Sequence, residues 1–190
     1  MDLLSKYVIY LMWLAWAAYW WLSASKVKAT ARQESLTSRA AHGVPMIVTV
    51  LLIIPPRLPL GVLSDRMLPG GAITYWIGAA MVAAGIAFAV WARAHLGKNW
   101  SGTVTVKSDH ELIRSGPYRF VRHPIYSGML LAVMGSAIAR GEWRGLLGVL
   151  ILLVALWRKL RHEERWMGES FGQEYAKYRS EVYALIPFVI

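Results

Sequence analysis

The most informative part of the sequence is HELIRSGPYRFVRHPIYSG, residues 110–128, a polar and cationic segment between apolar runs. It holds two His, three Arg, two Tyr, two Pro and two Gly. Polar and charged side chains raise the free energy of the protein when they lie beside lipid, unless they bind a partner or a ligand. The segment therefore predicts a binding site, and the apolar runs around it predict the membrane scaffold that holds this site.

The composition excludes several classes of protein. The chain has 190 residues, of which 56% are hydrophobic and ten are Trp, and this favours a single membrane domain covering residues 1–190. The formal charge is +10, but the basic residues lie mainly between apolar runs, which is typical of membrane-surface loops and not of a nucleic-acid interface. Because the chain has no Cys, disulfides, thiolate metal sites and a Cys nucleophile are excluded.

Five apolar segments predict an all-α integral membrane protein with five transmembrane helices. They cover residues 3–22, 44–54, 72–94, 125–139 and 145–157. We expect the second segment to be tilted, or broken by Pro55 and Pro56, and to continue toward Leu63. The last two segments are short and only residues 140–142 separate them, so they predict a C-terminal helical hairpin. Residues 161–179 then predict a C-terminal surface helix.

The distribution of charge predicts an orientation. Most Lys and Arg lie in the linker after the first segment, in the 110–128 segment and in the C-terminal region. The positive-inside rule places these parts in the cytoplasm, and five spans then place the N-terminus outside. We therefore expect a cytoplasmic motif loop and a cytoplasmic C-terminal helix, facing inward from the inner membrane if the source is prokaryotic.

The motif carries signals for a turn followed by a helix. The Gly-Pro-Tyr sequence at residues 116–118 predicts a turn, and Pro124 suits the first position of a helix. His123 and Tyr126 would then lie near a helix N-terminus, where backbone N–H groups favour a carboxylate or a phosphate.

Charges of both signs accompany this turn. Arg114, Arg119 and Arg122 supply cations, and across the hairpin Glu163 and Glu164 supply paired carboxylates. A zwitterionic ligand that carries a ribose would match both signs. The His residues elsewhere in the chain have no metal-ligand spacing, so no metal is predicted.

The order of these motifs resembles the isoprenylcysteine carboxyl methyltransferase family, and the related phospholipid N-methyltransferases share the broader pattern. The resemblance rests on residues 110–118, on RHPIYSG at 122–128, on Glu163-Glu164, on FGQEY at 171–175, on Tyr178 and on Pro187. It covers about the C-terminal half, from Leu96 onward. It predicts a catalytic half, residues 96–190, beside an N-terminal three-helix scaffold, residues 1–95.

The resemblance implies a methyltransferase that uses S-adenosylmethionine, releases S-adenosylhomocysteine and needs no metal. The cofactor-binding residues that it implies are Leu112, Gly116, Tyr118, His123, Tyr126 and Glu164. The catalytic residues that it implies are Arg122, which would orient a substrate carboxylate, and Glu163, which would contact the reacting end. Tyr175 and Tyr178 would pack a C-terminal lid, and a lipophilic small molecule or lipidated substrate would arrive from the bilayer.

Several functions are compatible with this set of residues. The resemblance favours carboxyl O-methylation of an isoprenylcysteine-like or other lipophilic acid, and a carboxylate nucleophile needs no general base. N-methylation of a phospholipid or other amine, or S-methylation of a thiol, would need deprotonation, for which Glu163 is the best candidate. A membrane reductase of the sterol reductase type and a non-catalytic membrane interaction protein are further alternatives, which titration with S-adenosylmethionine and NADPH would separate.

Overall fold

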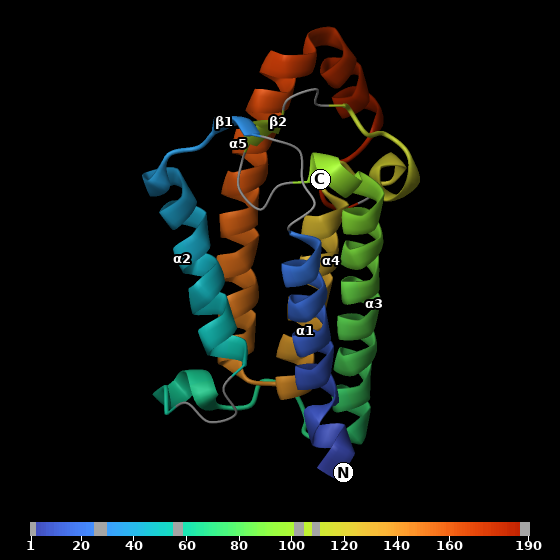
Figure 1. The fold of residues 1–190 in the computed structure, drawn as a ribbon. Helices are drawn as coiled ribbons and strands as arrows, with labels where there is room; N and C mark the ends of the chain where they lie inside the picture. Colours follow the sequence, from blue (N-terminus) through green and yellow to red (C-terminus); the bar gives the residue numbers. More distant parts are fainter. Residues whose placement is uncertain (1–2, 25–29, 55–58, 101–104, 108–110, 187–190) are drawn as a thin grey trace.

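The computed structural model describes residues 3–24, 30–54, 59–100, 105–107 and 111–186. Within these residues the α-helices are α1 (Leu3–Ser23), α2 (Leu36–Ile53), α3 (Ala72–Leu96), α4 (Pro124–Arg140) and α5 (Trp143–Glu181). Short 3₁₀ helices are η1 (Gly61–Ser64), η2 (Gly97–Asn99) and η3 (Gly116–Arg119), and two short strands, β1 (Thr30–Gln33) and β2 (Thr105–Lys107), pair antiparallel. The long helices run alternately up and down in one bundle (Figure 1), which confirms the helical class predicted from the sequence.

Glycines allow α3 and α4 to approach closely. A Cβ atom on Gly85 would lie 2.5 Å from the backbone of α4, and a Cβ atom on Gly135 would lie 2.5 Å from the carbonyl oxygen of Gly78. Gly128, seven residues before Gly135, meets the backbone of Gly85 in the same way. Small residues at such spacings let two helix backbones touch, which is the usual way that membrane helices associate. The small residues of α3 and α4 therefore let the two helices pack backbone to backbone.

The helices α4 and α5 form the predicted C-terminal hairpin. The turn between them uses Gly141, whose φ of 69° lies in the left-handed region, and the N–H of Gly141 donates to the carbonyl of Ala137. Residues 161–179 are helical, as predicted, but they do not begin a separate helix, because α5 continues from Trp143 through the charged residues to a kink at Gly172. At Gly172 φ is 50°, the helix bends, and a further helical stretch then runs to Glu181.

The helix α2 differs from the prediction at both ends. It begins at Leu36 and not at residue 44, because the Ser35 hydroxyl accepts a hydrogen bond from the Ser38 N–H at 3.2 Å and caps the first turn. It ends at Ile53, so it does not continue toward Leu63, which lies in η1. Residues 55–58, where the Pro-broken continuation was expected, lie outside the described residues.

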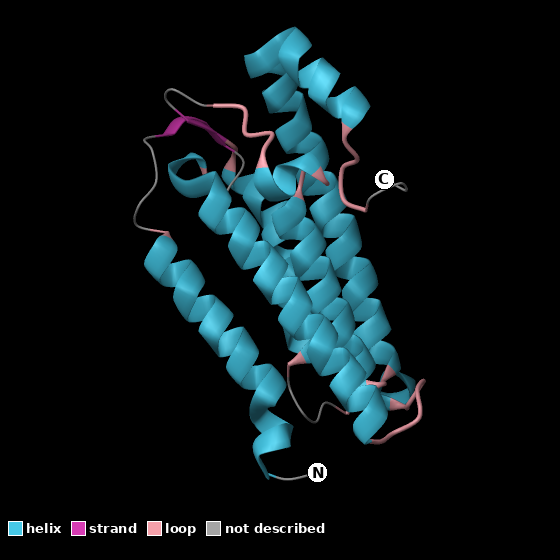
Figure 2. Cartoon of the chain, turned by 90° about the vertical axis from the view of Figure 1, so that its right-hand side faces the viewer, coloured by secondary structure: helices cyan, strands magenta, loops and turns pink. Residues whose placement is uncertain are grey.

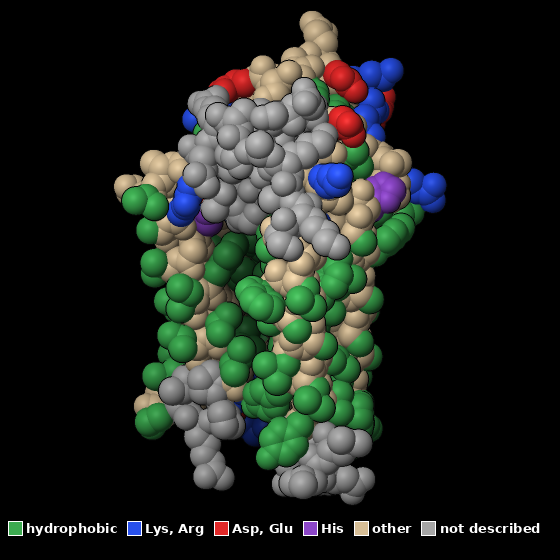
Figure 3. Space-filling model, viewed as in Figure 1, with side chains coloured by type: hydrophobic (Ala, Val, Ile, Leu, Met, Phe, Trp, Pro, Cys, Tyr) green, Lys and Arg blue, Asp and Glu red, His purple; other side chains and the backbone are tan. Residues whose placement is uncertain are grey.

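The outside of the bundle is apolar. Large hydrophobic side chains are exposed along α1, α2, α3 and α5, and Figure 3 shows them covering the bundle below a charged end. By length and hydropathy, two described helical stretches, Leu36–Ile53 and Ala72–Asn99, could cross a membrane. In Figure 2, α1 stands at the edge of the bundle, apart from the closely packed helices. The surface fits a membrane protein, and the five-span topology stays a prediction.

Candidate active site

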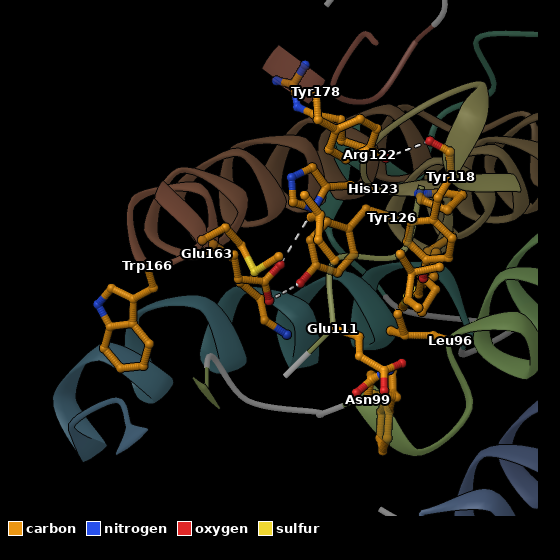
Figure 4. A pocket seen from close by; sticks show the side chains of 18 of the residues that line it. Leu96, Asn99, Glu111, Tyr118, Arg122, His123, Tyr126, Glu163, Trp166 and Tyr178 are labelled. Atoms are coloured by element: carbon orange, nitrogen blue, oxygen red, sulfur yellow. Dashed lines mark hydrogen bonds and ion pairs between the residues drawn. The ribbon is translucent and has the colours of Figure 1, made fainter. Parts of the chain in front are cut away.

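A cavity of about 330 Å³ lies at the charged end of the bundle (Figure 4). This volume is within the range of small-molecule sites. The loop before α4, the first turns of α4 and the middle of α5 supply its polar wall, and α1 and α2 supply apolar side chains. Among the residues that line it are Trp16, Trp20, Met46, Trp100, Glu111, Leu112, Tyr118, Arg122, His123, Tyr126, Lys159, Glu163, Trp166, Tyr175 and Tyr178.

The turn before α4 holds Tyr118 against the cavity. Gly116 has a φ of 59°, and its missing side chain matters because a Cβ atom there would lie 2.7 Å from the ring of His95. Tyr118 is buried, and its carbonyl oxygen accepts a hydrogen bond from the Tyr178 hydroxyl at 2.5 Å. Burial raises the pKa of the Tyr118 hydroxyl, so this group stays neutral.

The start of α4 aligns two rings with the cavity. Pro124 occupies the first turn of α4 and His123 is the residue before it, as the sequence predicts. The rings of His123 and Tyr126 are parallel, with centroids 5.4 Å apart. Both side chains point toward α5, where they meet Glu163 (Figure 4).

Glu163 is a fixed carboxylate at the cavity wall. The Tyr126 hydroxyl donates to Glu163 Oε1 at 2.6 Å, and Nδ1 of His123 lies 3.6 Å from Glu163 Oε2. Burial would raise the pKa of this carboxyl, but the hydrogen bonds from His123 and Tyr126 and the nearby charge of Lys159 outweigh burial and lower it. Glu163 is therefore ionised at neutral pH and is a weak base.

Glu164 faces away from the cavity and forms a buried ion pair. Nε and Nη2 of Arg122 donate to Glu164 Oε1 at 2.8 and 2.6 Å, and the two side chains are 8% and 6% exposed. Burial opposes ionisation of Glu164, but hydrogen bonds from His123 and Arg122 lower its pKa to about 2. The remaining nitrogen of Arg122, Nη1, donates to the carbonyls of Arg179, at 3.2 Å, and Val182.

The C-terminal segment, residues 182–186, lies beside the loop. The N–H of Arg122 donates to the carbonyl of Tyr183 at 2.8 Å. The N–H of His123 donates to the carbonyl of Ala184 at 2.9 Å. The ion pair and these backbone bonds together hold the end of the chain against the site.

His123 lies between the two carboxylates. Its Nε2 is 3.3 Å from Glu164 Oε1, and its Nδ1 faces Glu163. Burial alone would lower the pKa of the imidazole, but the hydrogen bonds and charges of both carboxylates outweigh burial and raise it. The ring thereby links Glu163 to Glu164.

Most of the residues singled out in the sequence meet at the cavity, although their roles stay predictions. Those that line it are Leu112, Tyr118, Arg122, His123, Tyr126, Glu163, Tyr175 and Tyr178. Two implied cofactor residues lie behind the wall. Gly116 packs against His95, and Glu164 faces Arg122.

Sequence reasoning missed much of the cavity wall. Trp16 and Trp20, one turn apart on α1, line the cavity, although they belong to an apolar segment that sequence reasoning treated only as scaffold. Lys159 and Trp166 flank Glu163 at helical spacings of four and three residues, a signal that could have found them. No local pattern predicts Met46, which reaches the cavity from α2 only through the tertiary fold.

Comparison with known proteins adds a second line of evidence. The sequence model of one family, described as phospholipid methyltransferase, matches residues 73–174. A probable protein-S-isoprenylcysteine O-methyltransferase of Oryza sativa subsp. indica is 26% identical over 186 residues, covering 89% of this chain and 96% of the relative. The protein-S-isoprenylcysteine O-methyltransferase B of Arabidopsis thaliana is 24% identical over 173 residues, covering 82% of this chain and 86% of the relative.

A solved structure shares the fold. It is that of a eukaryotic intramembrane Ras methyltransferase, an isoprenylcysteine carboxyl methyltransferase, with a TM-score of 0.52 and 24% identity. The match covers 80% of this chain and 52% of that one, so the chain spans about half the length of the eukaryotic protein. The similarity to known proteins extends beyond the C-terminal half, to which the motifs alone had limited it.

Proposed function

Because the chain belongs to the phospholipid methyltransferase family, and its full-length relatives are isoprenylcysteine O-methyltransferases, we propose that it is an integral membrane enzyme that methylates the carboxylate of a lipophilic, isoprenylcysteine-like acid. The resemblance inferred from the motifs is thereby confirmed at the level of the family. The substrate, the methyl donor and the orientation in the membrane are parts of the proposal.

The cavity wall fits S-adenosylmethionine as the donor. Glu111 and Glu163 offer carboxylates that accept hydrogen bonds from ribose hydroxyls or balance a cation. Trp100, Trp166 and Tyr178 offer aromatic faces, which favour both a purine ring and a positively charged sulfonium. When bound, this donor supplies a methyl group that is already activated for transfer.

The residues of the chain would then align the reactants and exclude water. Tyr126 and His123 hold the Glu163 carboxylate in one orientation, so that its charge needs no rearrangement during the reaction. The aromatic wall and the C-terminal segment keep water from the acceptor and position it for in-line attack. Arg122 is engaged on all three of its nitrogens, so it supports the site by holding Glu164 and the C-terminal segment in place.

The contacts of Glu163 and His123 are the observation that carries the choice of a carboxylate acceptor. The Tyr126 hydroxyl donates to one oxygen of Glu163 and His123 faces the other, contacts that also lower the pKa of the Glu163 carboxyl, and both ring nitrogens of His123 face glutamate carboxylates, so neither group is placed to take a proton from an acceptor. An amine or thiol acceptor would have to lose a proton in the site, whereas a carboxylate acceptor would not. N-methylation of a phospholipid amine is the second candidate, favoured by the description of the matching family.

A lipophilic acceptor could reach the cavity from the side of the bundle. Trp16 and Trp20 of α1 and Met46 of α2 line the cavity, and both helices expose large apolar side chains outward. In Figure 3 the surface between α1 and α2 is hollowed and hydrophobic. We propose that the hydrocarbon tail lies between these helices while the polar end meets the cavity.

The charged end of the bundle is proposed to face the cytoplasm. The helix α1 begins at the opposite end, and residues 182–186 lie at the end that carries the cavity (Figure 1). Five spans with basic residues inside would place the two termini on opposite sides. Reporter fusions should report an external N-terminus and a cytoplasmic C-terminus, and two fusions on the same side would refute five spans.

Methyl transfer measured on the purified protein in lipid nanodiscs tests the function. The donor is S-adenosylmethionine with a labelled methyl group, and the acceptors are an S-isoprenylated N-acetylcysteine, its methyl ester and phosphatidylethanolamine. We expect label in a base-labile ester formed from the acid, and none in the other two acceptors. Transfer to phosphatidylethanolamine instead would favour the second candidate, and binding of NADPH but not of S-adenosylhomocysteine would refute both.

A further inference from the structure

The helix α1 presents a row of tryptophans to the inside of the bundle. Trp13, Trp16 and Trp20 follow one another at spacings of three and four residues, so they share one face of the helix. All three are half-buried, whereas the next residue, Trp21, is 78% exposed. The ring centroids of Trp13 and Trp16 are 5.5 Å apart, edge to face, and those of Trp16 and Trp20 are 4.9 Å apart. The three indoles therefore form one continuous aromatic surface.

The cavity uses one end of this row, and Trp13 closes the other end. Trp16 and Trp20 line the cavity, and Trp13 lies one turn farther from the charged end of the bundle. Trp13 packs, as Met46 of α2 does, against the core cluster that α2, α4 and α5 share. Its indole N–H donates to the Ser136 hydroxyl on α4 at 3.0 Å. Trp13 thus bridges from α1 to α4 just past the end of the cavity wall.

Other contacts tie α1 to the bundle beyond both ends of the row. The Tyr10 hydroxyl donates to the carbonyl of Ile54, at the end of α2, at 3.2 Å. Past the other end of the row, Nη2 of Arg93 on α3 donates to the carbonyl of Ser23 at 2.6 Å. Because α1 is held at both ends, the hollow between α1 and α2 (Figure 3) has a defined length along the tryptophan row.

We propose that Trp13 forms the end of the hollow in which the acceptor's hydrocarbon tail lies, and that it thereby limits the length of the tail that the enzyme accepts. The inference rests on the proposed function, because it names the residue that selects the tail of that substrate. From Trp20 to Trp13 the helix rises about 10.5 Å, which is close to the length of an extended geranyl group. A longer tail would have to displace the indole from Ser136 and from the core, which costs a hydrogen bond and overpacks the site.

The test uses the whole protein in lipid nanodiscs, with Trp13→Ala, Ser136→Ala and the control Trp21→Ala. The first variant opens the end of the hollow, and the second keeps the indole but removes its hydrogen-bond acceptor. The control removes an exposed tryptophan from the same helix, and Trp21 does not line the cavity.

The acceptors are N-acetylcysteines that carry an S-geranyl, S-farnesyl or S-geranylgeranyl group. They are dosed as a mole fraction of the lipid, so that the partitioning of longer tails into the membrane does not enter KM. Initial rates of methyl transfer give KM, and the shift in melting temperature at a fixed mole fraction reports binding without turnover. Binding of S-adenosylhomocysteine reports whether each variant is folded.

For the wild type we expect KM to rise from the geranyl to the geranylgeranyl acid. In Trp13→Ala the KM for the geranylgeranyl acid should fall about 10- to 100-fold, the range for relief of overpacking in a packed site, while the geranyl acid gains nothing. Ser136→Ala should lower the same KM about 3- to 10-fold, as for loss of one hydrogen bond that holds the indole. Trp21→Ala should keep the wild-type order of the three acids.

A wild-type KM that falls steadily through the geranylgeranyl acid would overturn the proposal. A purely structural role for Trp13 would also overturn it, and would show as a higher KM for all three acids alike in Trp13→Ala and Ser136→Ala. If Trp13→Ala does not bind S-adenosylhomocysteine, Ser136→Ala decides by the same criteria. Melting shifts that depend on tail length and on Trp13, without methyl transfer, would support this inference and refute the proposed function. Methyl transfer with a KM independent of tail length would do the reverse.

Discussion

Replacing Arg122 should destabilise the folded protein, because the buried carboxylate of Glu164 would lose its ion-pair partner. The guanidinium and the Glu164 carboxylate are 8% and 6% exposed, and their nitrogen–oxygen distances are 2.6 and 2.8 Å. Removing one partner of a buried ion pair leaves the other charge unpaired, which costs about 3–5 kcal/mol. Arg122→Ala should lower the free energy of unfolding by about that amount, and Arg122→Lys by about 1–3 kcal/mol, because Lys cannot reach the carboxylate and two carbonyls together.

The assay is unfolding of the purified protein in detergent micelles, followed by fluorescence of its tryptophans, together with limited proteolysis of the C-terminal segment. Glu164→Ala and the double variant Arg122→Ala/Glu164→Ala complete a double-mutant cycle. The double variant should be more stable than the sum of the single losses predicts, with a coupling of about 1–3 kcal/mol. The C-terminal segment should be cleaved faster in the single variants, because Arg122 also holds the carbonyl of Val182.

A substrate role for Arg122 would give a different pattern. If the guanidinium mainly orients the acceptor, Arg122→Lys would leave unfolding and proteolysis unchanged and reduce only turnover. A coupling energy near zero together with wild-type stability would therefore refute the structural role of Arg122 in holding Glu164 and the C-terminal segment. It would favour the role that the family resemblance implies, which is to orient a substrate carboxylate.

Four further outcomes can be measured on the same preparations. Glu163→Gln should reduce turnover of an acid acceptor about 10- to 100-fold by removing a preorganised charge, with initial rates as the readout and S-adenosylhomocysteine binding as the check on folding. Gly85→Ala should lower the unfolding free energy by about 1–3 kcal/mol, because its Cβ atom would lie 2.5 Å from the backbone of α4, whereas Gly168→Ala, with nothing within 4 Å, should be neutral or stabilising. Stability should fall as pH drops from about 4.5 toward about 2, because the folded pKa of Glu164 is depressed, and this loss should be smaller in Glu164→Gln. Since the folded pKa of His123 is raised, its contribution is present below about 6.5 and should be lost as pH rises through the folded value, which titration of unfolding midpoints in His123→Gln would check.

The sequence predicts the helix start and the turn of the hairpin because these features depend on residues that are close together in the chain. Pro124 begins α4 and Gly141 ends the turn after it, as a fixed φ and a left-handed φ require. His123 and Tyr126 therefore lie at a helix start, and the carboxylate of Glu163 lies across from them. These relations follow from spacing within one hairpin.

The errors come from polar residues inside helices. Hydropathy placed the start of α2 at residue 44, but the helix begins eight residues earlier, and His42 is buried there with its Nε2 3.3 Å from a carboxylate oxygen of Glu34. Hydropathy also placed the end of the second hairpin helix near Trp157. No Gly or Pro follows before Gly168, and the backbone stays helical past Gly168 as far as the kink at Gly172. Charge marks where a helix leaves the apolar region, and it does not mark where the helix ends.

The neighbouring glutamates Glu163 and Glu164 have different surroundings in the structure. Adjacent residues on an α-helix point about 100° apart, so Glu163 and Glu164 cannot face the same way. Glu164 meets Arg122 outside the cavity wall, while Glu163 lines the cavity and meets Tyr126. His123 contacts both, so the buried ion pair that holds the C-terminal segment also fixes the ring that contacts the Glu163 carboxylate. One helical step thus separates the glutamate of the buried ion pair from the glutamate that lines the cavity.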